Sequence, residues 1–200
     1  MDDIVHIPVV ETIVLVDYDN IRKDRPERSL ADAEANLLEI TEILSAECVK
    51  VAPTIQEVEL RLYGGWITQQ GQYSHRAQML LSILASARKK FHGVMIRPEL
   101  VFRLANTPHA RFVGTLREDR NPPQQKMVDT LMAIDVLTLA ESFTVFLATD
   151  DDDLVPAIAA AAIRSTQAAY LIRRRPDGIG LNDEVCRRMK VQFVCLPEGF

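Results

Sequence analysis

The chain lacks a long apolar run: no stretch of its 200 residues approaches the roughly 20 consecutive apolar residues that cross a bilayer. It also lacks the basic start of a secretory signal, because residues 2 and 3 are both aspartate. We therefore expect a soluble, cytoplasmic protein with no membrane partner.

Cysteine and histidine are scarce, with 3 and 4 residues respectively. Cys48, Cys186 and Cys195 are odd in number and share no metal-ligand spacing, so we expect reduced, mostly buried thiols. The histidines are scattered and none of them forms the paired spacing of a zinc site. These absences argue against a disulfide framework and against zinc.

An excess of basic residues is also missing, since the net charge is −5, and this argues against a nucleic-acid binder of uniformly basic surface. The basic residues are grouped instead, with one group at 22–28 and another at 173–175. Such groups can form a phosphate-binding rim on an acidic protein. Solvated surface arginine is the alternative for either group.

What the chain does contain is two apolar runs that stop at carboxylates. Residues 13–16 lead into Asp17, and residues 145–148 lead through a threonine into four aspartates at 150–153. A buried parallel strand delivers the side chains at its end to the sheet edge where open α/β folds bind ligands. Carboxylates gathered there repel each other unless a cation lies between them. Mg²⁺ or Mn²⁺ prefers such oxygen ligands, so this pattern indicates a metal-dependent enzyme.

Strand and helix patterns alternate along the chain. The expected strands are 12–17, 58–63, 93–104, 110–116, 145–148, 168–172 and 192–196, and the expected helices are 30–46, 74–90, 124–142, one from 155, and 181–189. The alternation predicts an α/β fold with a doubly wound, mostly parallel sheet flanked by helices. No repeat or linker interrupts it, so we expect one domain over 1–200.

The predicted helix 124–142 carries a third acidic group. Its apolar stripe, at about 100° per residue, consists of Val128, Met132, Ala133, Val136, Leu139 and Ala140. Asp129 falls in the middle of this stripe, where a carboxylate is costly unless it is paired or ligated. It is therefore a candidate metal ligand, and an ion pair with Lys126 is the alternative. Asp135, at the edge of the stripe, supports the ligands or has a purely structural role.

The four aspartates at 150–153 cannot all be ligands, because aspartate near a helix start also caps the helix and interacts with its dipole. We expect Asp151 and Asp153, two residues apart, to be the pair that faces the ligand-binding crevice at the sheet edge. In the first segment Asp17 ends the strand, and Asn20 is placed to orient a ligand or a water molecule.

Three motifs in this order resemble the NYN branch of the PIN-like nucleases. Members of that branch have a strand that ends in D-x-x-N, similar to Asp17-Tyr18-Asp19-Asn20. They have a helix that opens K-x-V-D with a later aspartate, similar to Lys126-Met127-Val128-Asp129 and Asp135. They also have a turn S-G-D-x-D-F-x-P, similar to 149–156, where this chain has Thr-Asp in place of Ser-Gly and Leu in place of Phe. The resemblance covers roughly 13–196.

The resemblance implies a single NYN/PIN-like nuclease domain with the strand order 3-2-1-4-5. It implies hydrolysis of RNA phosphodiester bonds with Mg²⁺ or Mn²⁺, and an endoribonuclease is the main expectation. Exonuclease action, DNA as a substrate and a homo-oligomer are left open. The implied metal ligands are Asp17, Asp129, Asp151 and Asp153, with Asn20 as a further catalytic residue. The implied substrate-binding residues are Lys126, Arg22 and Lys23, and the implied supporting residues are Asp135 and Thr149.

Two other functions compete with this interpretation. Asp17-Tyr18-Asp19 also resembles the D-x-D nucleophile and acid pair of haloacid-dehalogenase-type phosphatases. Against it, neither Ser nor Thr ends the predicted strand 58–63, and the helix that carries Asp129 would have no role. The second alternative is a non-catalytic member of the PIN-like fold that binds RNA or a protein.

Overall fold

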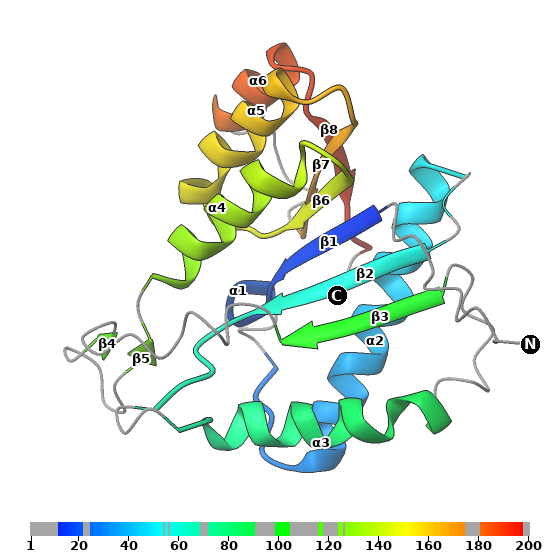
Figure 1. The fold of residues 1–200 in the computed structure, drawn as a ribbon, viewed down its shortest axis with the longest axis vertical. Helices are drawn as coiled ribbons and strands as arrows, with labels where there is room; N and C mark the ends of the chain where they lie inside the picture. Colours follow the sequence, from blue (N-terminus) through cyan, green and yellow to red (C-terminus); the bar gives the residue numbers. More distant parts are fainter. Residues whose placement is uncertain are drawn as a thin grey trace, which may run out of the picture.

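In the computed structural model the chain forms a parallel sheet between two layers of helices (Figure 1). The structure describes residues 12–21, 25–53, 55, 57–68, 72–90, 99–104, 116–117, 124–125, 127–174 and 181–197. The strands of the main sheet are β1 (Thr12–Asp17), β2 (Glu57–Tyr63), β3 (Glu99–Leu104), β6 (Thr144–Ala148), β7 (Ala169–Arg173) and β8 (Gln192–Cys195). A separate antiparallel pair consists of β4 (Leu116–Arg117) and β5 (Gln124–Gln125).

The main sheet has six strands in the order β3-β2-β1-β6-β7-β8, and every neighbouring pair is parallel. The expected α/β class, with a parallel sheet flanked by helices, is therefore confirmed. The sheet differs from the five-strand expectation because β8 adds a strand at the edge beside β7. The chain turns from β1 toward β2 on one side, while β6 lies on the other, so the sheet has its switch point between β1 and β6.

Helices cover both faces of this sheet. The helices are α1 (Tyr18–Ile21), α2 (Leu30–Val51), α3 (His75–Lys90), α4 (Val128–Leu139), α5 (Val155–Arg164) and α6 (Leu181–Arg188), with a short 3₁₀ turn η2 (Asp152–Leu154). One apolar core joins α2 and α3 to the sheet, and a second joins α4, α5 and α6 to its other face. None of the described helices is both long and apolar enough to cross a membrane.

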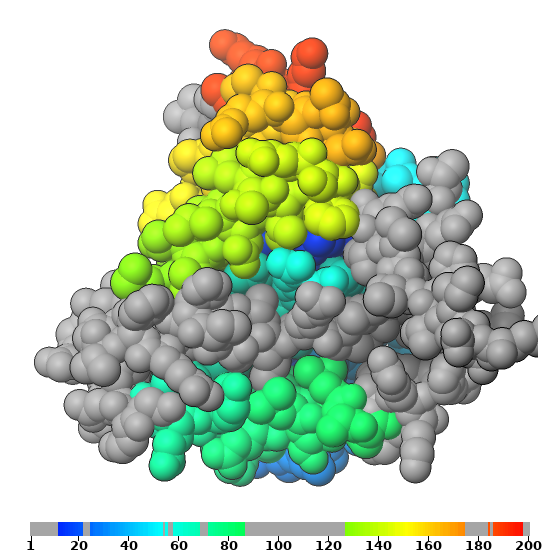
Figure 2. Space-filling view, viewed as in Figure 1, coloured from blue at the N-terminus to red at the C-terminus, as the bar shows by residue number. Residues whose placement is uncertain are grey.

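Strand β1 lies at the centre of both cores. Val14 and Val16 pack into the core with α2 and α3, while Ile13 and Leu15 pack into the core with α4 and α5. All six residues of β1 are buried, as expected of a continuous apolar run between two helical layers. In the space-filling view only a small blue area is visible, between the yellow-green residues and the cyan residues (Figure 2). The core thus fixes the position of Asp17, the last residue of β1.

The helix ends follow local sequence signals at two of the helices. The Ser29 hydroxyl accepts a hydrogen bond from the Asp32 N–H at the start of α2, and the Ser74 hydroxyl accepts one from the Ala77 N–H at the start of α3, each at 3.2 Å. Ser29 and Ser74 therefore cap the N-terminal ends of α2 and α3. Helix α2 continues to Val51, beyond the expected end at residue 46.

The expectation for 124–142 needs a correction. Helix α4 begins only at Val128, because Gln124 and Gln125 pair with β4 as a strand. The residue before the helix, Met127, has a φ of 67°, which is left-handed and interrupts any helical path from 124.

Most of the predicted strand 110–116 lies outside the described residues. The cysteines form no disulfide, and two of them, Cys48 and Cys186, are buried as expected.

Candidate metal centre

Asp17 is the buried member of the acidic site. It ends β1 at the switch point, and only 4% of its surface is exposed. Its carboxylate accepts a hydrogen bond from the Thr149 hydroxyl at 2.7 Å and another from the backbone N–H of Asn20. Burial, followed by repulsion from Asp129 and Asp19, nevertheless raises the pKa of Asp17 from 3.8 to about 6. An acid with this pKa is close to half-protonated in mildly acidic solution when no cation is nearby.

The loop after β6 brings the second acid to the first. Thr149 is fully buried, and its N–H donates to the carbonyl of Ile172 on β7 at 3.1 Å. Its hydroxyl donates to Asp17 and accepts a hydrogen bond from the backbone N–H of Asp151 at 3.0 Å. Thr149 therefore links the two aspartates through a single oxygen atom. A role of Thr149 in supporting metal ligands stays a prediction, and it would act through these two hydrogen bonds.

Asp151 has two functions in this loop. One of its carboxylate oxygens accepts the N–H of Asp153 at 2.9 Å and so caps the turn η2. Its carboxylate also belongs to a cluster with Asp17 and Asp129, in which one oxygen from each residue lies within 4.8 Å of the others. The aspartates come from β1, from the start of α4 and from the loop after β6, so their predicted convergence at one edge of the sheet is confirmed.

The position of Asp129 differs from the expected one. Asp129 lies on the expected stripe by its helical spacing, but it is in the first turn of α4 and is exposed. The buried residues of that stripe, Met132 and Val136, come one and two turns later. Because α4 begins at Val128, Asp129 projects from the end of the helix toward the sheet edge. The cost of burying a carboxylate in the core therefore does not apply to Asp129.

Asp153 does not belong to this cluster, although the sequence pairs it with Asp151. It is exposed in η2, and only its backbone N–H is bound to Asp151. Asn20 is partly exposed, and its carbonyl accepts a hydrogen bond from Arg174 at 3.1 Å. The predicted substrate-binding residues Arg22, Lys23 and Lys126 lie outside the described residues.

Asp135 is bound by a tyrosine from the neighbouring strand. The hydroxyl of Tyr63 donates a hydrogen bond to its carboxylate, and Tyr63 lies beside Asp17 in the register of β1 and β2. Burial and the nearby carboxylate of Asp135 raise the pKa of Tyr63, so its hydroxyl keeps its proton. The contact joins α4 to the end of β2 and so has a structural role, while a supporting role of Asp135 for the metal ligands stays a prediction.

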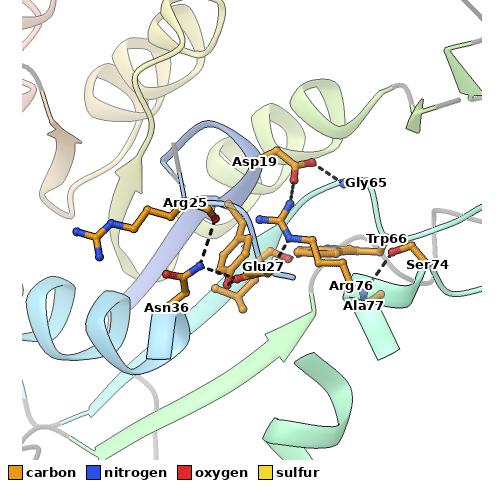
Figure 3. A network of polar contacts seen from close by, with 11 residues as sticks. Asp19, Arg25, Glu27, Asn36, Gly65, Trp66, Ser74, Arg76 and Ala77 are labelled. Atoms are coloured by element: carbon orange, nitrogen blue, oxygen red, sulfur yellow. Dashed lines mark hydrogen bonds and ion pairs between the residues drawn. The ribbon is translucent and has the colours of Figure 1, made fainter. Parts of the chain in front are cut away.

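Asp19 is held away from the cluster by a second polar network (Figure 3). One of its carboxylate oxygens binds the guanidinium of Arg76, and the other accepts the backbone N–H of Gly65 at 2.8 Å. Arg76 also pairs with the buried carboxylate of Glu27 at 2.8 Å. Glu27 in turn accepts a hydrogen bond from the Tyr18 hydroxyl. This network anchors α1 to α3 and to the loop after β2.

Sequence reasoning missed the ion pairs that surround the second aspartate segment. Arg173 pairs with Asp152, and Arg174 pairs with Asp150, each at 2.8 Å. The sequence suggests a phosphate-binding or solvated role for these arginines, whereas both have little exposed side-chain surface, 6% and 14%. The signal that could have indicated the pairs is their position at the end of β7, the strand beside β6.

Comparisons of this chain with protein-family models, with curated proteins and with solved structures found no match.

Proposed function

We propose that this protein is a metal-dependent ribonuclease in which Asp17, Asp129 and Asp151 hold Mg²⁺ or Mn²⁺. The observation that carries the proposal is the approach of their carboxylate oxygens to within 4.8 Å of one another. Oxygen ligands about 2.1 Å from an octahedral Mg²⁺ are roughly 3 to 4 Å apart, so a small inward movement of these side chains suffices.

The charge around the cluster supports a cation there. Among the described residues, neither Asp17 nor Asp151 takes part in an ion pair, while the nearby arginines Arg173 and Arg174 are bound to other aspartates. Burial is the main cause of the raised pKa of Asp17, and repulsion from the nearby carboxylates of Asp129 and Asp19 adds to it. A divalent cation would lower that pKa and offset the repulsion. The donor set, oxygen only, fits Mg²⁺ and Mn²⁺ better than softer metals.

The NYN-like motifs support the same function. The three clustered aspartates are among the four that the D-x-x-N, K-x-V-D and S-G-D-x-D-F-x-P resemblances imply as metal ligands, and Asp153 is the one left outside the cluster. An all-parallel sheet between two layers of helices, as this chain has, is compatible with a PIN-like domain. RNA is the proposed substrate on the basis of this resemblance, and Lys126, Arg22 and Lys23 remain its predicted contacts.

In this proposal the residues of the chain have distinct parts. The bound metal supplies an activated water molecule and stabilises charge on the phosphate. Thr149 and the backbone of Asn20 hold the carboxylate of Asp17 in one orientation through their hydrogen bonds. Thr149 also fixes the backbone of Asp151, and Asp129 joins the cluster from the first turn of α4. The side chain of Asn20 is proposed to orient water or phosphate.

The phosphatase alternative is less compatible with the geometry. In that mechanism Asp17 would be the nucleophile and Asp19 the general acid. Both carboxylate oxygens of Asp19 are instead engaged by Arg76 and the Gly65 N–H. An acid held in this way is poorly placed to deliver a proton to a substrate beside Asp17.

A cleavage assay with matched variants tests the proposal. Purified protein is incubated with end-labelled RNA in Mn²⁺, in Mg²⁺ and in EDTA, beside Asp129→Asn and Asp152→Asn prepared identically. Asp129 is exposed, so its replacement should spare the fold, and Asp152 is a carboxylate of the same site region outside the cluster. We expect Mn²⁺-dependent cleavage that Asp129→Asn lowers at least about a hundredfold, since loss of even outer-shell metal partners costs 10–100-fold.

Three other outcomes would contradict the proposal. RNA binding without cleavage would support the non-catalytic alternative. Cleavage in EDTA would remove the role of the metal. Trapping of an aspartyl-phosphate analogue on Asp17 by beryllofluoride would support the phosphatase.

A further inference from the structure

Arg174 joins two segments that flank the acidic cluster. Its backbone N–H and its Nε both donate to the carboxylate of Asp150, at 2.9 and 2.8 Å. Its Nη2 donates to the carbonyl of Asn20 at 3.1 Å. Only 14% of the Arg174 side chain and 5% of the Asp150 side chain are exposed, so both lie inside the protein. One guanidinium group thus connects β7, the loop after β6 and the segment after β1.

These contacts lead directly to the proposed metal ligands. Asp150 lies between Thr149, whose hydroxyl binds Asp17, and Asp151. Asn20 donates its backbone N–H to the carboxylate of Asp17. A displacement of either segment would therefore change the separation between Asp17 and Asp151.

We propose that Arg174 is a positioning residue of the metal centre, because it binds Asp150 and the Asn20 carbonyl at once and so holds Asp17 and Asp151 at a metal-binding separation. This inference rests on the proposed function. Asp150 stands where the NYN motif that this chain resembles has glycine, so the motif itself does not include this pair.

Charge compensation alone does not explain these contacts. A buried Asp150 needs a cation, and a pair of opposite charges satisfies that need. Neutralising the charge of Asp150 does not require the further hydrogen bond that Arg174 donates to the carbonyl of Asn20 across the switch point. The neighbouring pair Arg173–Asp152 is a natural comparison, because its acid is 51% exposed and lies on the same loop.

The backbone of Asp150 needs no glycine, since the positive φ values among described non-glycine residues are at Met127 and Lys190.

The test measures Mn²⁺ affinity by electron paramagnetic resonance, together with unfolding in urea, for wild-type protein and four variants. Arg174→Gln removes the contacts but leaves Asp150 as an unpaired buried charge, so it can fail to fold. The double variant Asp150→Asn/Arg174→Gln removes both charges and keeps an acceptor for the residue 174 N–H. Arg174→Lys keeps the positive charge but cannot bind Asp150 and Asn20 together. Asp152→Asn is the control on the neighbouring pair.

We expect the double variant and Arg174→Lys to fold and to bind Mn²⁺ about tenfold more weakly or worse, as for other residues that orient metal ligands. Asp152→Asn should stay within about twofold of wild type, because its pair does not reach Asn20. Wild-type affinity in the folded double variant would overturn the positioning role and leave the proposed function intact. Absence of Mn²⁺ binding by the wild-type protein would instead overturn the proposed function, and this inference with it.

Discussion

From the burial of Asp17 we predict an effect on folding stability that can be measured without a substrate. In the metal-free protein, replacement by Asn removes an ionisable group but keeps an acceptor for the Thr149 hydroxyl at nearly the same place. The pKa of Asp17 is raised from 3.8 to about 6, mainly by burial. We therefore expect Asp17→Asn to be more stable than wild type at neutral pH, even though it removes a proposed metal ligand.

The magnitude and its pH range follow from the pKa values. Below pH 3.8 the residue is protonated in both folded and unfolded chains and has no effect. Between pH 3.8 and about 6 the unfolded chain releases its proton while folded Asp17 keeps it, so wild-type stability falls as the pH rises. Above about pH 6 the full cost applies. At about 1.4 kcal/mol per pH unit, this cost is about 3 kcal/mol.

Urea unfolding in EDTA at pH 3.5, 5 and 7.5 measures the effect, with Asp153→Asn as the control at an exposed acid. The difference in unfolding free energy between Asp17→Asn and wild type should grow by about 3 kcal/mol from the lowest to the highest pH. A difference that stays constant over this range would refute the reasoning. Addition of Mn²⁺ at pH 7.5 should stabilise wild type and not the variant, because the ion binds only the folded wild-type site.

Two further predictions concern backbone and packing. Met127 has a left-handed φ of 67° just before α4, a conformation that glycine adopts without strain. Met127→Gly should therefore raise the unfolding free energy by up to about 1 kcal/mol, whereas Met127→Ala should not. Equal stability of the Gly and Ala variants in urea would contradict the presence of strain at this residue. Gly64→Ala should cost about 1–3 kcal/mol, because a Cβ there would lie 2.9 Å from the ring of fully buried Trp66. Thermal unfolding in a Trp66→Phe background should show a smaller cost, and an unchanged cost would place the clash elsewhere.

The amino-acid sequence by itself determined the elements that deliver the acids. The apolar run before Asp17 is buried on both faces, and the second run ends at the loop that carries Asp151. Both follow from local patterning, because a buried strand must be continuously apolar and must stop where the chain meets water. The cap at Ser74 is local in the same sense.

The tertiary structure decided which of the acids meet. Asp129 enters the cluster because the first turn of α4 packs beside the end of β1 and the loop after β6, an arrangement that helical periodicity does not reveal. Arg174 binds Asp150 because β7 lies beside β6, and strand neighbours depend on the order of the whole sheet. Asp153 carries the same charge in the same loop as Asp151, yet stays outside the cluster because it lies within the turn that Asp151 caps. Residue type and spacing are local properties, whereas the distance between two side chains depends on every element packed between them.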